Sequence, residues 1–393
     1  MGIKAKHYLF SIAILTLGMG LGRFIYTGMM PLMFNEGIFD FQALSYIASS
    51  NYLGYLFGAL LFSFALFHRS EKLKISLIVS VISTVLLLYL MSMTTNFMGV
   101  LIIRFLAGIS SAAAIIFGSI TVIKYFSSRL MTAAFFSGVG LGILVGNELV
   151  NILSFQQDSS LQIWFYAAIL AAVIAGLIFV FYPKKEQSAI STSVYESAKQ
   201  GQVQSLQHSE ISWISLIILY GFAGYGYIIT ATYLPVIAQS LPASLVTSHL
   251  WSLVGIGAMI SCYLWLFIEQ KIGTLSALFW NLLTQSLFVL LSIFSDSLLL
   301  LIISALGLGG TFMGTTSLVM PLARRLSVPK TLNLVGLVTL TYGIGQILGP
   351  IATSVIETMT GSLLFATISG AVALLIASLM VLYEKRSRGF ASA

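Results

Sequence analysis

Three ionisable side chains lie well inside long apolar stretches of this sequence: Arg23, Arg104 and Glu148. An ionised group is costly in hydrocarbon unless it is paired or faces water, so each is a candidate functional residue. A guanidinium binds a carboxylate or phosphate through two parallel hydrogen bonds and keeps its proton. A carboxylate can take up and release a proton. These residue types predict an anion site and a proton-coupling site.

The position of Arg23 favours the anion site. At about 1.5 Å per residue it lies about 15 Å from the outer end of its stretch, close to the midplane of a roughly 30 Å hydrocarbon core. Tyr26 and Thr27, three and four residues on, share its helix face. The structural alternative is that Glu148 or backbone carbonyls neutralise Arg23. We expect Glu148 to pair with an arginine, and either Arg23 or Arg104 fits; Arg104 and Glu148 form the candidate proton-coupling pair.

Other candidate binding residues are aromatic or amide side chains. The seventh apolar stretch places Tyr220 and Tyr227 on one face with Gly224. Packing between helices and anchoring at the membrane interface are the structural alternatives for these side chains. The further candidates for substrate binding are Asn51, Tyr55, Trp251 and Gln346, and Asn281, Gln285 and Tyr342 are added as possible cavity-lining residues.

The elements that carry these residues are predicted to be membrane helices. The chain has 393 residues, 58% apolar and 8% charged, whereas soluble domains have about a quarter charged residues. Long apolar runs without period-two alternation predict an all-α polytopic membrane protein rather than a barrel. Twelve spans are expected, at residues 8–34, 42–67, 75–94, 97–122, 131–154, 161–182, 212–239, 249–268, 273–294, 297–320, 332–357 and 363–383.

The charge distribution predicts the orientation of these spans. Of the 19 Lys and Arg residues, 17 fall on one side of the predicted membrane, and the opposite loops carry acidic residues only. Because basic residues collect in cytoplasmic loops, both termini are expected on the cytoplasmic side. The membrane is expected to be the inner (cytoplasmic) membrane. The 17 basic residues are Lys4, Lys6, Arg69, Lys72, Lys74, Lys124, Arg129, Lys184, Lys185, Lys199, Lys271, Arg324, Arg325, Lys330, Lys385, Arg386 and Arg388.

The chain divides into two similar halves, residues 1–182 and 212–393, joined by a polar linker over 183–211. Gly20, Gly22 and Pro31 recur as Gly224, Gly226 and Pro235, an offset of 204 residues. Glycines 140, 142 and 146 recur as glycines 343, 345 and 349. Six helices per copy give parallel repeats, which place a site between the halves near the midplane.

Other functional classes find no support in the sequence. One cysteine, Cys262, and four scattered histidines offer no metal-ligand spacing. The net charge of +7 is accounted for by short basic clusters between spans, so nucleic-acid binding is not expected. Gly20-Leu21-Gly22 follows no strand and precedes no phosphate-binding lysine. No nucleophile–base pair lies in the spans, and neither enzymatic activity nor a cofactor is predicted.

Several motifs resemble those of the major facilitator superfamily. They are Arg104-Phe105-Leu106-Ala107-Gly108, the basic segment 68–74, and Gly345-Gln346-Ile347-Leu348-Gly349-Pro350. Gly20-Leu21-Gly22-Arg23 and Asn51-Tyr52-Leu53-Gly54-Tyr55 resemble the YbfB/YjiJ-type branch. The resemblance implies two parallel six-helix bundles, alternating access, an influence of Arg104 on proton coupling, a cavity-lining seventh span and a monomer.

These observations together predict a secondary transporter that moves a small, carboxylate-bearing organic anion across the inner membrane with protons. One alternative is an exporter of amphipathic drugs or metabolites by proton antiport. Asn147 disfavours it, because it stands where antiporters carry the proline of their fifth-helix motif. A remote alternative is a membrane sensor or scaffold that transports nothing.

Overall fold

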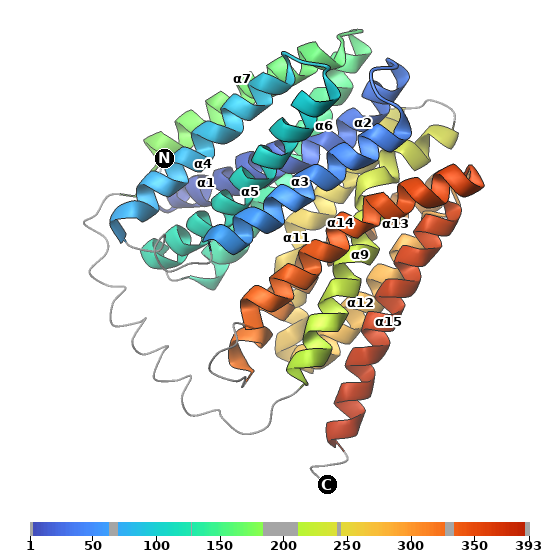
Figure 1. Cartoon of the computed structure of the whole chain (residues 1–393). Coiled ribbons are helices and arrows are strands. Elements are labelled where there is room, and N and C mark those ends of the chain that lie inside the picture. The colour runs from blue at the N-terminus through green and yellow to red at the C-terminus, as the bar shows by residue number, and fades with distance from the viewer. Residues whose placement is uncertain are drawn as a thin grey trace.

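The computed structural model describes residues 3–62, 70–126, 128–183, 211–241, 245–326 and 334–389, and within them the regular structure is entirely helical (Figure 1). The predicted linker, 183–211, lies almost wholly outside these ranges. Each of the twelve predicted spans coincides with a helical segment. They are α1–η1–α2 (Ile3–Leu15, Thr16–Phe24, Ile25–Asn35), α3 (Phe41–Phe62), α4 (Ser70–Met91), α5 (Phe97–Phe126), α6 (Arg129–Phe155), α7 (Ser160–Val180), α9 (Trp213–Ile237), α11 (Leu250–Ile272), α12 (Thr274–Leu291), α13 (Leu298–Arg325), α14 (Leu334–Thr360) and α15 (Leu364–Gly389).

Eleven of these segments in the described residues are long and apolar enough to cross a membrane. The remaining one, α3, is long enough at 22 residues but more polar. Its sequence includes Gln42, Asn51, Tyr52 and Tyr55, and Asn51 and Tyr52 are buried inside the protein. The low hydropathy of α3 therefore comes partly from polar groups that face other helices rather than lipid.

The first span is not a uniform α-helix. Its central nine residues, Thr16–Phe24, form the π-helix η1, all of them buried, between two α-helical pieces. A π-helix is rare, and short π segments in α-helices occur often at functional sites. Arg23 is the next-to-last residue of η1, so the distorted backbone carries the candidate anion-binding side chain.

Glycines let equivalent helices approach closely in both sequence halves. In the N-terminal half, a Cβ on Gly20 would overlap the backbone of Gly142 on α6. In the C-terminal half, a Cβ on Gly345 of α14 would overlap Gly221 and Tyr225 of α9. The first and fifth spans of each half thus pack through glycine in the same manner, as the sequence repeat predicts.

Hydrogen bonds between the two sequence halves gather on one side of the molecule. We call the helix ends where α1 begins and α15 ends the terminal side, and the opposite ends the far side. Beyond Arg23 toward the far side, Thr27 donates to the Ala231 carbonyl (3.2 Å) and Tyr233 to Ser45 Oγ (2.7 Å). On the terminal side, Figure 1 shows the start of α1 and the end of α15 well apart.

Candidate functional site

Arg23 lies at the centre of the molecule among aromatic rings. Its side chain is 3% exposed. The guanidinium Cζ lies 4.3 Å from the ring centroid of Tyr55 and 4.8 Å from that of Tyr52, both on α3. The Phe24 ring is 5.3 Å away. These cation–π contacts are attractive but leave the N–H edge of the guanidinium available for acceptors.

Among the described residues, the N–H edge of Arg23 meets a single hydrogen-bond acceptor, and that acceptor is neutral. Arg23 Nη2 donates to Gln346 Oε1 on α14 at 3.0 Å. Arg23 Nε is buried and has no hydrogen-bond partner in the part of the chain that the structure describes. No described carboxylate lies within salt-bridge distance of Arg23. The charge is therefore buried without a counter-charge from the described residues.

Gln346 joins Arg23 to a row of stacked rings. Its Nε2 donates to the Tyr227 hydroxyl on α9. The Tyr227 ring is nearly parallel to Phe312 (centroids 5.4 Å apart, 9°) and to Tyr342 (5.6 Å, 12°), and Tyr342 stacks on Tyr220 (4.3 Å, 20°). We call these four residues, Tyr220, Tyr342, Tyr227 and Phe312, the ring stack. It draws on α9, α13 and α14, and offset stacking of this kind stabilises aromatic pairs.

Arg104 does not contact Glu148, contrary to the expected pairing. Its side chain, 1% exposed, donates from Nη1 to the Gly22 carbonyl (3.2 Å) and from Nη2 to the Arg23 carbonyl (2.9 Å). Both carbonyls belong to the end of η1. Buried backbone carbonyls need hydrogen-bond donors, and at the end of η1 the Arg104 guanidinium supplies two, so it is engaged there rather than with Glu148. Arg104 thereby fixes the backbone that carries Arg23.

Glu148 pairs with neither arginine but with α11. Its Oε1 lies 2.7 Å from His249 Nδ1 and accepts a hydrogen bond from Ser252 Oγ. The Glu148 side chain is 33% exposed and that of His249 is 39% exposed. The neighbouring Asn147 donates to the Ser248 carbonyl and to Ser252 Oγ, each at 2.9 Å. We call this group the far-side cluster: Asn147, Glu148, Ser248, His249 and Ser252.

Four of the predicted binding residues donate their side-chain hydrogen bonds to backbone carbonyls. Tyr26 donates to Leu44 (2.9 Å) and Thr27 to Ala231 (3.2 Å). Asn51 donates to Arg104 (2.9 Å) and Trp251 to Phe24 (3.2 Å). The predicted Tyr55, Tyr227 and Gln346 do lie near Arg23, and Tyr220 lies further along the ring stack. Asn281 and Gln285 contact Thr311 and Thr315 within the C-terminal half.

Three contacts of the site were absent from the predicted set. Tyr52 faces Arg23 and could have been inferred, because it precedes Tyr55 by three residues on the same helix face. Phe312 completes the ring stack, but no sequence signal separates it from other core phenylalanines. His249 pairs with Glu148 across the halves, which only the crossing of α6 and α11 reveals.

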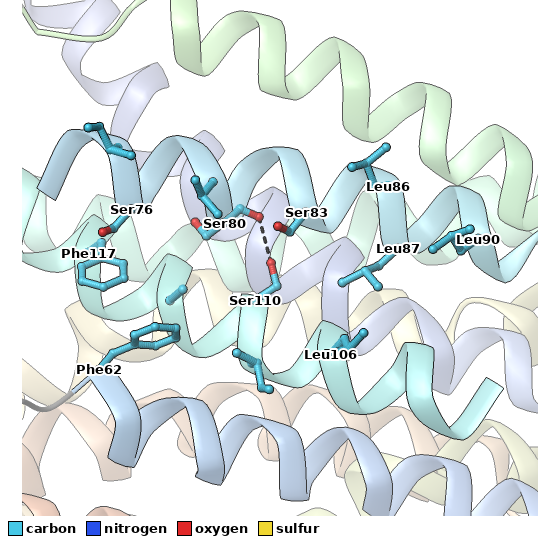
Figure 2. Close-up of a pocket in the computed structure, with 14 residues that line it drawn as sticks. Phe62, Ser76, Ser80, Ser83, Leu86, Leu87, Leu90, Leu106, Ser110 and Phe117 are labelled. Carbon is cyan, nitrogen blue, oxygen red and sulfur yellow. Dashed lines mark hydrogen bonds between the residues drawn. The ribbon is translucent and has the colours of Figure 1, made fainter. Parts of the chain in front are cut away.

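The pocket drawn in Figure 2 lies elsewhere, between α3, α4 and α5. Its volume is about 510 Å³ and it includes the exposed side chains of Ile75, Leu86 and Leu90. Ser110, which donates to the Ser80 carbonyl at 2.8 Å, is among its few polar residues. None of the described side chains that line it is charged, so its chemistry suits an apolar contact on the outer surface of the helices rather than an anion. Within the described ranges, no group of three or more His, Cys, Asp or Glu residues is arranged to hold a metal ion.

Comparison with known proteins gives a family and a fold. The crystal structure of the nucleoside transporter NupG (D323A mutant) superposes with a TM-score of 0.68 over 98% of each chain, at 14% sequence identity. That identity supports a common fold only. No curated protein matches the sequence. The sequence profile described as "Uncharacterised MFS-type transporter YbfB" matches residues 15–382. The chain therefore belongs to this family of major facilitator transporters.

Proposed function

We propose that this transporter moves a small organic anion, with a carboxylate as its charged group, and that Arg23 binds that group. The observation that carries the proposal is the buried guanidinium of Arg23, whose hydrogen-bond acceptor among the described residues is the neutral amide of Gln346. Burying a charge without a counter-charge costs several kcal/mol. A carboxylate that replaces the Gln346 oxygen would supply the missing charge and a second acceptor for the buried Nε.

Alternating access between two six-helix bundles, residues 1–182 and 212–393, is the proposed mechanism. The glycine contacts repeated in each half and the likeness to NupG support this division. The hydrogen bonds between the halves lie beyond Arg23 toward the far side, and these would hold that side closed. Substrate would then reach Arg23 from the terminal side, and transport requires the far-side bonds to break in the opposite state.

Glu148 is the proposed proton carrier. Its hydrogen bonds with His249 and Ser252 join the two halves, so a change of its protonation state would alter a contact that differs between the two transport states. Arg104, by contrast, is proposed to position Arg23 through its hydrogen bonds to the Gly22 and Arg23 carbonyls rather than to carry protons.

The distribution of basic residues supports an inner-membrane location with cytoplasmic termini. A monomer is sufficient for this mechanism.

One observation favours the second candidate, an exporter of amphipathic compounds by proton antiport. The ring stack brings four aromatic rings together beside Arg23 and Gln346. Asn147 disfavours this candidate. Its amide donates to Ser248 and Ser252, whereas the proline that antiporters carry at this position has no side-chain donor. Drug susceptibility of cells lacking or overproducing the protein separates the two: an anion carrier leaves it unchanged.

The test of the main proposal is transport by purified protein in liposomes with variants of Arg23. Counterflow of radiolabelled lactate, succinate and benzoate is compared in wild type, Arg23→Gln and Arg23→Lys. We expect Arg23→Gln to abolish counterflow, and Arg23→Lys to retain a fraction because a lysine keeps the charge but not the planar pair of donors. Tyr89→Leu, a change at a 40% exposed ring on α4, is the matched control. Wild-type counterflow in both Arg23 variants would remove the anion proposal.

A further inference from the structure

The surroundings of Arg23 restrict the direction from which an anion can approach it. Both Tyr52 and Tyr55 place a ring within 5 Å of the guanidinium carbon, at 4.8 and 4.3 Å. The N–H donors of a guanidinium all lie in its plane, so a carboxylate that accepts two of them approaches in that plane. In that plane lies the amide oxygen of Gln346, 3.0 Å from Nη2. The carboxylate therefore takes the place of this amide.

The position that the carboxylate takes adjoins the ring stack. Gln346 Nε2 donates to the Tyr227 hydroxyl, and the Tyr227 ring is within 12° of parallel to both Phe312 and Tyr342. Tyr342 and Tyr55 are partly exposed, whereas Tyr227 and Tyr220 are buried. On their helices, Tyr55, Tyr342 and Tyr220 lie on the terminal side of Arg23. The body of a bound anion would thus extend from Arg23 along aromatic rings.

We propose that the substrate is a planar aromatic carboxylate, with its carboxylate on Arg23 and its ring against Tyr342 and Tyr55. This inference rests on the proposed function and narrows its substrate class. An aryl carboxylate is flat throughout, so its carboxylate can pair edge-on with the guanidinium. Its ring face then meets the partly exposed Tyr55 and the edge of Tyr342, because both faces of Tyr342 are stacked on Tyr220 and Tyr227. A saturated ring of similar size carries the same charge but has no π face.

The experiment measures binding of matched ligands to the purified full-length protein by isothermal titration calorimetry. The probes are benzoate, cyclohexanecarboxylate and the neutral benzamide. Benzoate and cyclohexanecarboxylate differ in planarity at equal charge, and benzoate and benzamide differ in charge at equal planarity. We expect the dissociation constant for benzoate to be lower than that for cyclohexanecarboxylate by about fivefold, the size of one aromatic contact. Benzamide should bind at least about tenfold more weakly than benzoate.

Two variants of Tyr342 separate ring contact from stability. Tyr342→Leu removes the ring and should make benzoate and cyclohexanecarboxylate bind equally. Tyr342→Phe keeps the ring and should preserve the preference for benzoate. Tyr89→Leu controls for loss of an unrelated ring, since Tyr89 is exposed on α4. A preference for benzoate that survives Tyr342→Leu overturns the assignment of Tyr342.

The outcomes for the two proposals are distinct. Equal binding of benzoate and cyclohexanecarboxylate to wild type, with both lost in Arg23→Gln, overturns the planar substrate and leaves the anion site standing. Binding of benzamide as tight as that of benzoate, unchanged in Arg23→Gln, overturns both proposals. Failure of wild type to bind either carboxylate at millimolar concentration overturns the planar aromatic substrate, and counterflow of lactate and succinate then decides the anion proposal.

Discussion

At the scale of single residues, the two buried arginines, Arg23 and Arg104, differ in their hydrogen-bond partners and so in their roles. Arg104 donates hydrogen bonds from Nη1 and Nη2 to backbone carbonyls of η1. Arg23 donates from Nη2 to the side-chain amide of Gln346, a partner that can be exchanged. An arginine bonded to backbone is fixed in every state in which that backbone persists. An arginine bonded to a glutamine can exchange that partner for a better acceptor at little cost. This difference is the physical basis for placing substrate at Arg23.

The role of Arg104 predicts a stability defect. Arg104→Leu leaves the Gly22 and Arg23 carbonyls buried without their donors, which should lower the free energy of unfolding by about 2 kcal/mol or more. Arg104→Lys keeps the charge and one donor group, so its loss should be smaller. Thermal unfolding of the detergent-solubilised protein measures both. Two variants that unfold at the wild-type temperature would show that these hydrogen bonds do not hold η1.

Glu148 carries the prediction about protons. Glu148→Gln keeps the size of the side chain but cannot release a proton, so substrate accumulation driven by a pH gradient should fall to the level seen without one. Exchange of substrate between the two sides of the liposome, which moves no net protons, should continue. His249→Gln is the companion variant, because His249 Nδ1 lies 2.7 Å from Glu148 Oε1. Unchanged pH-driven accumulation in Glu148→Gln would exclude this residue as the carrier.

At the scale of elements, η1 depends on glycine for its packing. A Cβ on Gly20 would overlap the backbone of Gly142, whereas a Cβ on Gly176 of α7 would meet nothing within 4 Å. The same substitution should therefore act in opposite directions. Gly20→Ala should destabilise by about 1–3 kcal/mol through overpacking, and Gly176→Ala should stabilise by about 0.5–1 kcal/mol through helix propensity. Unfolding temperatures of the two variants provide the comparison, and a neutral Gly20→Ala would contradict the close packing of η1 on α6.

The sequence predicts where the helices lie more completely than it predicts distortions within them. Apolar length located the twelve long helical segments of the described residues, because a membrane span must satisfy its backbone within itself. It did not indicate the π-helix, because η1 is supported by side chains from other helices: Arg104 on α5 and Trp251 on α11. The candidate site divides in the same way. Residue chemistry was enough to select Arg23 as a candidate, whereas the partner of Glu148 depends on where α6 crosses α11.

At the scale of the whole molecule, the repeat brings equivalent positions together between the halves. Thr27 and Ala231 are separated by the repeat offset of 204 residues, and the Thr27 hydroxyl donates to the Ala231 carbonyl. Arg23 and Tyr227 are separated by the same offset, and Gln346 bonds to both. Arg23 and the Thr27–Ala231 contact, which is proposed to close the far side, thus lie one helical turn apart along η1–α2 and α9. Opening the far side must therefore change the surroundings of Arg23.

This coupling makes a cross-link at Thr27 and Ala231 a test of the transport cycle. A disulfide between Thr27→Cys and Ala231→Cys, formed with Cys262 replaced by Ala, should hold the far side closed and stop transport, and a reductant should restore it. Ser50→Cys with Leu101→Cys is the matched control, because Ser50 donates to the Leu101 carbonyl at 2.8 Å within one half. That cross-link should leave transport intact, since the two half-molecules are proposed to move as units. Full transport by the cross-linked Thr27–Ala231 protein would mean that the halves need not separate there, and the alternating-access proposal would fail.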